Sequence, residues 1–100
     1  MGKYISLITE TQLGETHINE SVARVNRIEG EAAKFGVKVT GVYWTLGEYD
    51  GVLMFEAEKD ETAAAFLHFI ASKGAVRTHT LRAFDVNETR QIVETLSSKG

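Results

Sequence analysis

The order of the strand-like and helix-like apolar patterns along the chain is the feature that most limits its fold. Residues 4–9 alternate in polarity and are rich in β-branched side chains, which predicts a strand. From Ile18 to Phe35 the apolar residues recur every three or four positions, the period of one helix face. Gly36 follows, where a glycine in the left-handed conformation commonly ends a helix. The first third of the chain therefore predicts a strand and then a helix that ends at Gly36.

The middle of the chain predicts a hairpin and a second helix. Residues 37–46 and 51–57 read as two strands, and the short connector between them favours antiparallel pairing. Asp60 is a suitable N-cap for a helix over residues 61–72. We expect the inward side of this helix to consist of Ala64, Leu67, Ile70 and Ala71.

The end of the chain predicts a fourth strand over residues 75–84 and a last helix, capped by Asn87 and running through Ser97. Its inward residues are expected to be Ile92, Val93 and Leu96. The order is β-α-β-β-α-β plus a C-terminal helix. This order predicts an α+β, ferredoxin-like fold: a four-stranded antiparallel sheet with two helices on one face. At 100 residues the chain is expected to form a single domain over residues 1–100.

Composition narrows the classes of function. The net charge is −3 and the lysines and arginines are scattered, which argues against nucleic acid as a partner and against a DNA-binding regulator. The absence of cysteine excludes disulfides, thiolate metal sites and thiol catalysis. No apolar run approaches the ~18 residues that a membrane span needs, so we expect no membrane association and a cytoplasmic location.

The two hairpin strands carry apolar side chains on both of their faces. In the second strand one parity holds Val37, Val39, Gly41, Tyr43 and Thr45, and the other holds Lys38, Thr40, Val42, Trp44 and Leu46. In the third, Leu53 and Phe55 alternate with Val52 and Met54. The two helices can cover only one face, and a large bare apolar face is unusual for a monomer. We therefore expect a second copy of the chain, a small-molecule ligand, or both to cover the other face, with two sheets facing each other in a homodimer or higher oligomer.

The hairpin also carries a motif. Gly47-Glu48-Tyr49-Asp50 matches the pattern Gly-x-Tyr-Asp, and it is followed by the acidic helix start and by "TLRAF" at residues 80–84. Over roughly residues 3–86 the chain resembles the GYD-domain family of small bacterial and archaeal proteins, which is related to the dimeric α/β-barrel superfamily. The resemblance implies the fold deduced above and a sheet-to-sheet dimer. It implies no reaction, because fold relatives range from monooxygenases and isomerases to amino-acid-sensing domains.

Tyr49 and Asp50 have two interpretations. In a site, Asp50 would act as a general base or hydrogen-bond acceptor, with Tyr49 as its donor or as an anchor for a substrate. In a turn, the Asp50 carboxylate would accept nearby backbone N–H groups, and Tyr49 would pack over the hairpin. The structural interpretation is the favoured one.

His79 and Arg82 in the fourth strand are the other catalytic candidates. Strand alternation places Arg77, His79 and Leu81 on one face and Arg82 on the opposite face. His79 could accept a proton in a partly apolar cavity or lie at an interface. Arg82 could clamp a substrate carboxylate, but a structural ion pair with Asp50 or Glu56 is favoured.

Tyr43, Trp44 and Met54 are candidates for binding a planar ligand, although such residues on a sheet more often form a core or a dimer interface. No histidine or carboxylate spacing predicts a metal site, and no cofactor is expected. A haem-ligand role for His68 or His79 is a minor alternative.

Two classes of function remain. The first is a homo-oligomeric binding or assembly module with a cleft between the sheet and its partner. The second is a cofactor-independent enzyme, similar to a monooxygenase or isomerase, acting on a small aromatic or carboxylate metabolite. In the enzyme, Asp50, His79, Tyr49 and Arg82 would have to converge around a cavity that excludes water. The lack of any strong catalytic motif favours the binding module.

Overall fold

The computed structural model describes all 100 residues, Met1–Gly100. The strands are β1 (Gly2–Glu10), β2 (Val37–Trp44), β3 (Gly51–Ala57) and β4 (Val76–Ala83). The α-helices are α1 (Gln12–Thr16), α2 (Ser21–Ala32), α3 (Asp60–Ala71) and α4 (Val86–Lys99), and the short 3₁₀ helices are η1 (Ile18–Glu20) and η2 (Ala33–Phe35). No helix is both long enough and apolar enough to cross a bilayer.

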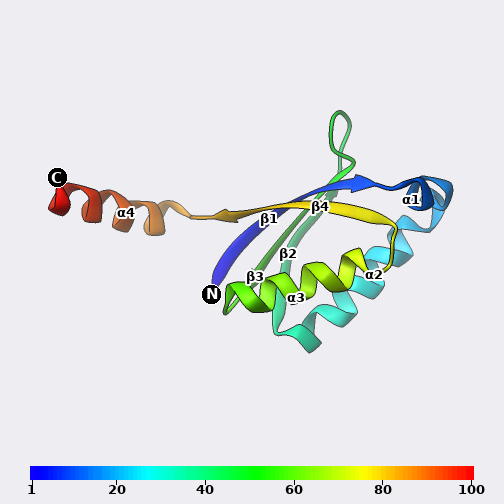
Figure 1. Ribbon diagram of the computed structural model, residues 1–100, viewed down its shortest axis with the longest axis horizontal. Coiled ribbons are helices and arrows are strands. Elements are labelled where there is room, and N and C mark those ends of the chain that lie inside the picture. Colours follow the sequence, from blue (N-terminus) through cyan, green and yellow to red (C-terminus); the bar gives the residue numbers. More distant parts are fainter.

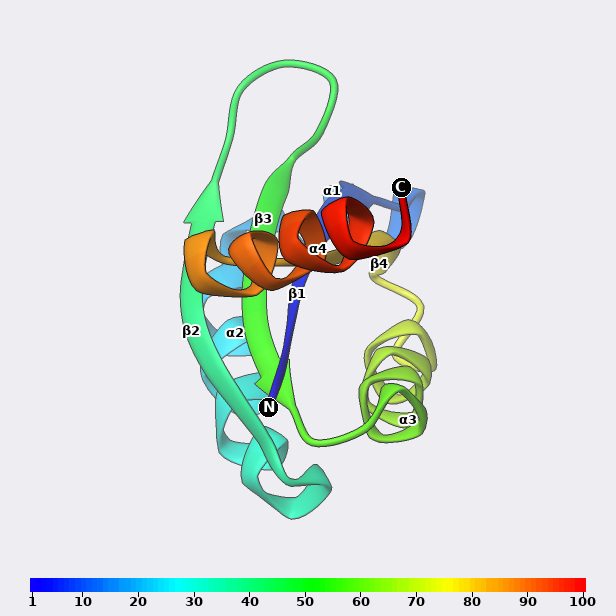
Figure 2. The same cartoon turned by 90° about the vertical axis from the view of Figure 1, so that its left-hand side faces the viewer.

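The four strands form one antiparallel sheet in the order β2-β3-β1-β4. Helices α2 and α3 lie on one side of this sheet, and the N-terminal strand β1 lies in its interior (Figures 1 and 2). This arrangement confirms the predicted ferredoxin-like fold with its antiparallel hairpin. We call the side that carries α2 and α3 the helix side.

Three aromatic rings form the centre of the core between the sheet and α3. Tyr4 stacks on Phe55 with ring centroids 5.1 Å apart, and Phe66 meets Phe55 edge to face at 5.2 Å. The Tyr4 hydroxyl donates a hydrogen bond to the Asp60 carboxylate, and burial together with this bond raises the pKa of Tyr4. Tyr4 therefore joins β1, β3 and the first turn of α3 through one side chain.

A β-bulge at Thr40 changes the faces of β2. Val39 pairs with Phe55 and Gly41 pairs with Met54, so Thr40 is an extra residue between two ladder positions. Val37 and Val39 before the bulge lie on the helix side, and Val42 after it also packs against the core there. The expected strict alternation is therefore wrong past Thr40, because one inserted residue reverses the parity of every position that follows.

The first helical segment is shorter than predicted. The stripe over residues 18–35 divides into η1, α2 and η2, and its early members Ile18 and Val22 are exposed. Gly36 confirms its prediction, because it has a φ of 72° at the end of η2. The missed helix α1 begins at Thr11, whose hydroxyl caps it by accepting the Gly14 N–H.

The start and the buried side of α3 also differ from expectation. Lys59 occupies the N-cap position, and Asp60 is the first helical residue. The buried residues are Ala63, Phe66 and Ile70, so the predicted inward positions Ala64 and Ala71 are wrong, and Leu67 is only partly buried. Phe66 decides the orientation of the helix, because it is the side chain that fills the space over Phe55.

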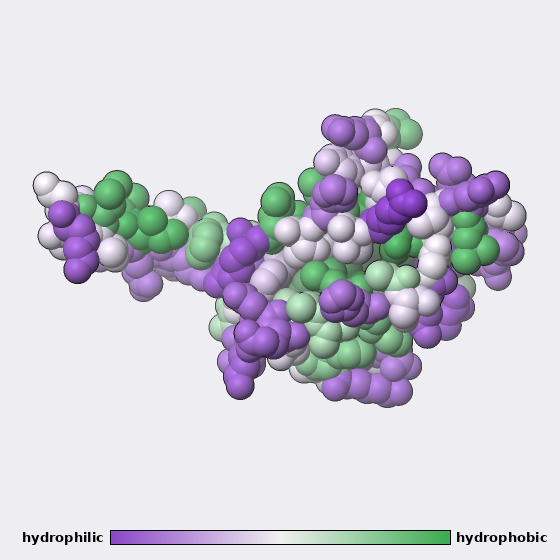
Figure 3. All heavy atoms as spheres, in the orientation of Figure 1, coloured by the Kyte–Doolittle hydropathy of each residue, from purple (hydrophilic) through white to green (hydrophobic).

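Helix α4 projects away from the rest of the molecule (Figure 1). Its predicted inward residues are wrong: Ile92, Val93 and Leu96 are 48%, 53% and 71% exposed. Hydrophobic side chains line this arm in Figure 3. A helix with an apolar stripe normally packs that stripe against another element. Helix α4 has no such partner within the chain.

A small polar cluster fixes the base of α4. The N-cap is Asp85, not Asn87, and Asp85 and Glu88 form a reciprocal capping box. The Glu88 backbone N–H lowers the pKa of Asp85, the Asp85 backbone N–H lowers that of Glu88, and the hydrogen bond with Asp85 raises the pKa of Lys3. These groups are partly exposed, and they hold the first turn of the arm beside β1.

The packing of α1 against the end of the sheet depends on a glycine. Gly14 is buried, and a methyl group at this position would overlap the Glu10 carboxylate and the Ala75 carbonyl. We expect Gly14→Ala to lower the free energy of unfolding by about 1–3 kcal/mol, as overpacking does. Thermal unfolding followed by circular dichroism measures this change.

Gly30 provides the matched control for that substitution. It lies in α2, and a methyl group added there would have no other atom within 4 Å. Gly30→Ala should leave stability unchanged or raise it by about 0.5–1 kcal/mol. Equal stability of Gly14→Ala and the native chain would contradict the tight packing at Gly14.

Candidate functional site

The side of the sheet opposite the helix side has no helix over it. We call it the open face. Its apolar members are Ile5, Leu7, Tyr43, Val52, Met54 and Leu81. The strand register makes them neighbours: Ile5 lies between Met54 and Leu81, and Leu7 lies between Val52 and His79. Leu81 and Tyr43 are 54% and 59% exposed, so a substantial apolar surface faces solvent.

The three ligand-binding candidates lie on two different sides. Tyr43 and Met54 both belong to the open face, and a methyl group on Gly41 would come within 2.5 Å of the Met54 Cε atom. Gly41 therefore gives the Met54 side chain room to lie across β2. Trp44 has the parity of Val42 on the helix side and is half exposed.

Tyr49 and His79 are brought together although thirty positions separate them. Their rings meet edge to face with centroids 6.2 Å apart. His79 pairs with Leu7 in the ladder and lies on the open face. It shares this side with Leu81 and lies opposite Arg82, which is the division that strand alternation predicted. The backbone carbonyl of Tyr49 accepts a hydrogen bond from the Thr45 hydroxyl, which fixes the loop that carries the ring.

Asp50 attaches the hairpin loop to the end of β1. Its carboxylate accepts the Glu10 backbone N–H at 2.7 Å, and its own N–H donates to the Ile8 carbonyl at 2.8 Å. Because β3 begins only at Gly51, these bonds extend the contact between the hairpin and β1 by one more residue, Asp50. Asp50 therefore binds a backbone N–H, as the structural interpretation expected, but this N–H belongs to β1 and not to the hairpin turn itself.

Arg82 lies on the helix side, away from His79. Its guanidinium is 5.5 Å from the Tyr4 ring centroid and 4.7 Å from that of Phe84, and one of its nitrogens is 3.8 Å from the Glu88 carboxylate. Arg82 is thus in an ion pair, but the expected partners Asp50 and Glu56 are wrong. Sequence spacing could not show that the first turn of α4 places the Glu88 carboxylate beside the Arg82 guanidinium.

The four catalytic candidates therefore divide into separate environments. Tyr49 and His79 share the open face, Asp50 bonds to β1, and Arg82 stacks on the opposite side near the base of α4. No group of three or more histidine, aspartate or glutamate side chains is arranged to hold a metal ion.

Sequence reasoning missed the contribution of β1 to the open face. Ile5 and Leu7 alternate with Tyr4 and Ser6, and Ser6 is buried with its hydroxyl 2.6 Å from that of Thr80. The apolar residues of β1 occur at both parities, as in β3. The pattern that indicated two apolar faces in the hairpin was therefore also present in the first strand.

Removal of the Asp50 carboxylate tests its structural role. We expect Asp50→Ala to lower the free energy of unfolding by about 1–3 kcal/mol, because it leaves the Glu10 N–H without its acceptor. Asp50→Asn keeps an acceptor and should cost less. Amide hydrogen exchange of Glu10 reports the bond directly, and its protection should fall in Asp50→Ala but not in the neighbouring exposed control Glu48→Ala. Unchanged protection in Asp50→Ala would contradict the anchor.

The chain matches known proteins over most of its length. The GYD domain model matches residues 4–93. A protein of Thermus thermophilus named glutamine synthetase and cystathionine beta-lyase binding protein is 37% identical over 87 residues, which cover 86% of this chain and 92% of the relative.

Solved structures show the same fold. A feast or famine regulatory protein of Mycobacterium tuberculosis complexed with L-methionine superposes with a TM-score of 0.67 at 20% identity, covering 86% of this chain and 52% of that one. This chain thus spans about half the length of that regulator. A 5-chloro-2-hydroxyhydroquinone dehydrochlorinase of Burkholderia phenoliruptrix superposes with a TM-score of 0.60 at 17% identity, covering 87% and 97%. Similarity at this level shows the fold alone. With the family match over residues 4–93 and the bare open face of its sheet, the chain belongs to the GYD domain family.

Proposed function

We propose that this chain is a protein-binding module that pairs with a second copy of itself through the open face. The dimer then binds an enzyme of amino-acid metabolism, with glutamine synthetase and cystathionine β-lyase as the candidates. The single observation that carries the self-pairing is the open face itself: six apolar side chains on one continuous sheet surface with no element over them.

The size of the apolar surface fits a symmetric dimer. Four strands about 4.8 Å apart and about seven residues long span roughly 440 Å² in projection. A standard interface buries about 800 Å² of accessible surface on each partner. The projected open face is about half of that area, and contact through the bare stripe of α4 would add to it. Face-to-face packing of two identical sheets would bury the same patch on both copies.

The relative supports the choice of partner. The Thermus thermophilus protein is named for binding glutamine synthetase and cystathionine beta-lyase, and it aligns along nearly its whole length. A binding role needs no convergent catalytic group. That agrees with the bonds that engage Asp50 and Arg82 in this chain.

One observation favours the enzymatic alternative. Tyr49 and His79 meet on the open face, where a second sheet would enclose them together with Leu7. A cofactor-independent enzyme acting on a small aromatic or carboxylate metabolite would use them as hydrogen-bond donor and proton acceptor. Binding of the enzyme partners by His79→Ala at native strength would separate the two functions.

A single charged substitution on the open face tests the self-pairing. Leu81→Asp places a carboxylate within the proposed interface, on the edge strand β4, where burial without a counter-charge is strongly unfavourable. Light scattering after size-exclusion chromatography should give about twice the 11.1 kDa chain mass for the native protein and the monomer mass for the variant.

Leu46→Asp is the matched control, because Leu46 is fully exposed in the hairpin loop and outside the open face. It should remain dimeric. Circular dichroism must show that both variants are folded. A native protein that runs as a monomer at ~100 μM, well above the Kd expected for a standard interface, would contradict the proposal.

Partner binding is tested with purified glutamine synthetase and cystathionine β-lyase from the organism that encodes the chain. Biolayer interferometry with the immobilised chain should show saturable binding of at least one of them. An unrelated enzyme of similar net charge serves as the control. Binding of neither enzyme, or equal binding of the control, would overturn the protein-binding role while leaving the dimer untouched.

A further inference from the structure

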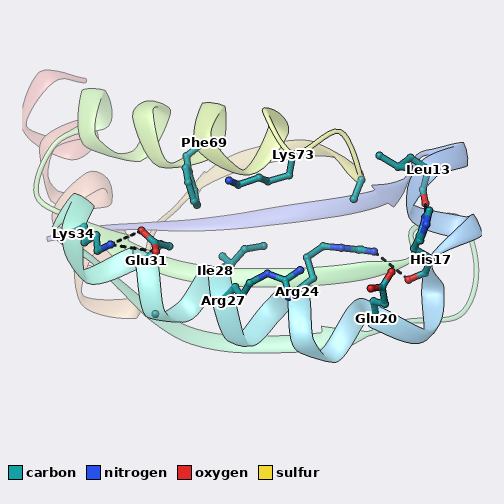
Figure 4. Close-up of a pocket in the computed structure, with 12 residues that line it drawn as sticks. Leu13, His17, Glu20, Arg24, Arg27, Ile28, Glu31, Lys34, Phe69 and Lys73 are labelled. Carbon is teal, nitrogen blue, oxygen red and sulfur yellow. Dashed lines mark hydrogen bonds and ion pairs between the residues drawn. The ribbon is translucent and has the colours of Figure 1, made fainter.

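A groove separates α2 from α3 on the helix side, remote from the open face. Its volume is about 860 Å³, and its walls come from α1, α2, α3 and the residues around them. Figure 4 shows the Phe69 ring pointing from α3 toward α2, with the Lys73 side chain beside it from the turn after α3. Arg24, Arg27 and Ile28 come from α2 on the opposite wall. The apolar lining residues are Leu13, Ile28, Phe69 and Ala75.

The groove is positively charged although the chain is acidic. It is lined by four cations, namely Arg24, Arg27, Lys34 and Lys73, but by only two carboxylates, Glu20 and Glu31. Glu10, which pairs with Arg24, raises the number of carboxylates at this depression to three, so the excess is one positive charge in a chain whose net charge is −3. The basic residues are scattered along the sequence, and the fold gathers these four around one depression.

Two of the four cations are without an acidic partner. Arg24 forms an ion pair with Glu10, with side chains only 11% and 8% exposed, and Lys34 pairs with Glu31. Arg27 and Lys73 form no ion pair. The Lys73 ammonium lies 4.7 Å from the centroid of the Phe69 ring, so a charged and an apolar contact lie side by side on the α3 wall.

We propose that this groove binds an acidic segment of the partner enzyme, with carboxylates at Arg27 and Lys73 and an apolar side chain against Ile28 and Phe69. The inference rests on the proposed protein-binding function and names the surface that performs it. The occupant follows from charge complementarity and from shape.

The shape favours a chain segment over a small molecule. The depression is an open groove and not an enclosed cavity, whereas small-ligand sites bury most of their ligand. From Arg24 to Lys34 the α2 wall is about 15 Å long at 1.5 Å per residue. An extended peptide of about five residues spans that length. Alternating acidic and apolar side chains on such a segment would meet the charged rims and the apolar floor in turn.

Charge reversal in the groove tests the proposal. Arg27→Glu combined with Lys73→Glu changes the net charge from −3 to −7. The control, Lys59→Glu combined with Lys99→Glu, makes the same change at two exposed positions outside the groove. We expect the groove variant to bind the enzyme at least tenfold more weakly than the native chain and the control to stay within about twofold, with both variants folded and dimeric.

A zero-length carbodiimide cross-link identifies the contact. It joins an amine to a carboxylate only when the two touch, so mass spectrometry of the native complex should find Lys73 coupled to an aspartate or glutamate of the enzyme. The same reaction at Lys59 should give no cross-link to the enzyme.

The outcomes separate the groove from the wider function. Loss of binding in the groove variant alone, with a cross-link at Lys73, supports the proposal. Native binding by the groove variant overturns the groove while the protein-binding role stands. Equal loss of binding in both variants would mean that net charge alone controls the encounter. That result also overturns the proposed groove site. Binding of neither enzyme by the native chain overturns the role and the groove together.

Discussion

One constraint governs this protein: its sheet carries apolar side chains on both faces, and its two packed helices can cover only one. The helix side is completed by the Tyr4, Phe55 and Phe66 rings, which join β1, β3 and α3. The open face receives nothing from the chain, because α4 leaves the end of β4 and projects outward. The unpartnered surfaces of the molecule are therefore apolar and lie outside its own core.

Several polar side chains stabilise this arrangement of strands and helices. Asp50 attaches the hairpin loop to β1, Arg82 stacks on Tyr4 beside Glu88, and Asp85 caps α4 next to Lys3. Of the four catalytic candidates, Asp50 and Arg82 are engaged in bonds within the fold, and Tyr49 and His79 are left to contact each other. That pattern is typical of a scaffold that presents surfaces.

The two proposed surfaces lie on opposite sides of the sheet. A dimer formed through the open face would leave both grooves between α2 and α3 facing outward, one on each copy. Such a dimer offers two equivalent sites to an enzyme that is itself oligomeric, and binding at both sites together would be stronger than binding at either one. In this proposed arrangement a small chain would hold a much larger partner without a deep pocket.

Local patterns in the sequence determined the order of the four strands and the helices between them, the antiparallel hairpin, the glycine that ends η2 at Gly36, and the division of His79 and Arg82 between the two sides of β4. These follow from periodicity and backbone preference, which act over a few residues. The tertiary structure alone decided the bulge at Thr40, the direction of α4, and the partner of Arg82. It also decided that Arg27 and Lys73, forty-six positions apart, face one groove. Those outcomes depend on which side chains fill the space over Phe55 and on where distant segments meet, and no local pattern along the chain carries that information.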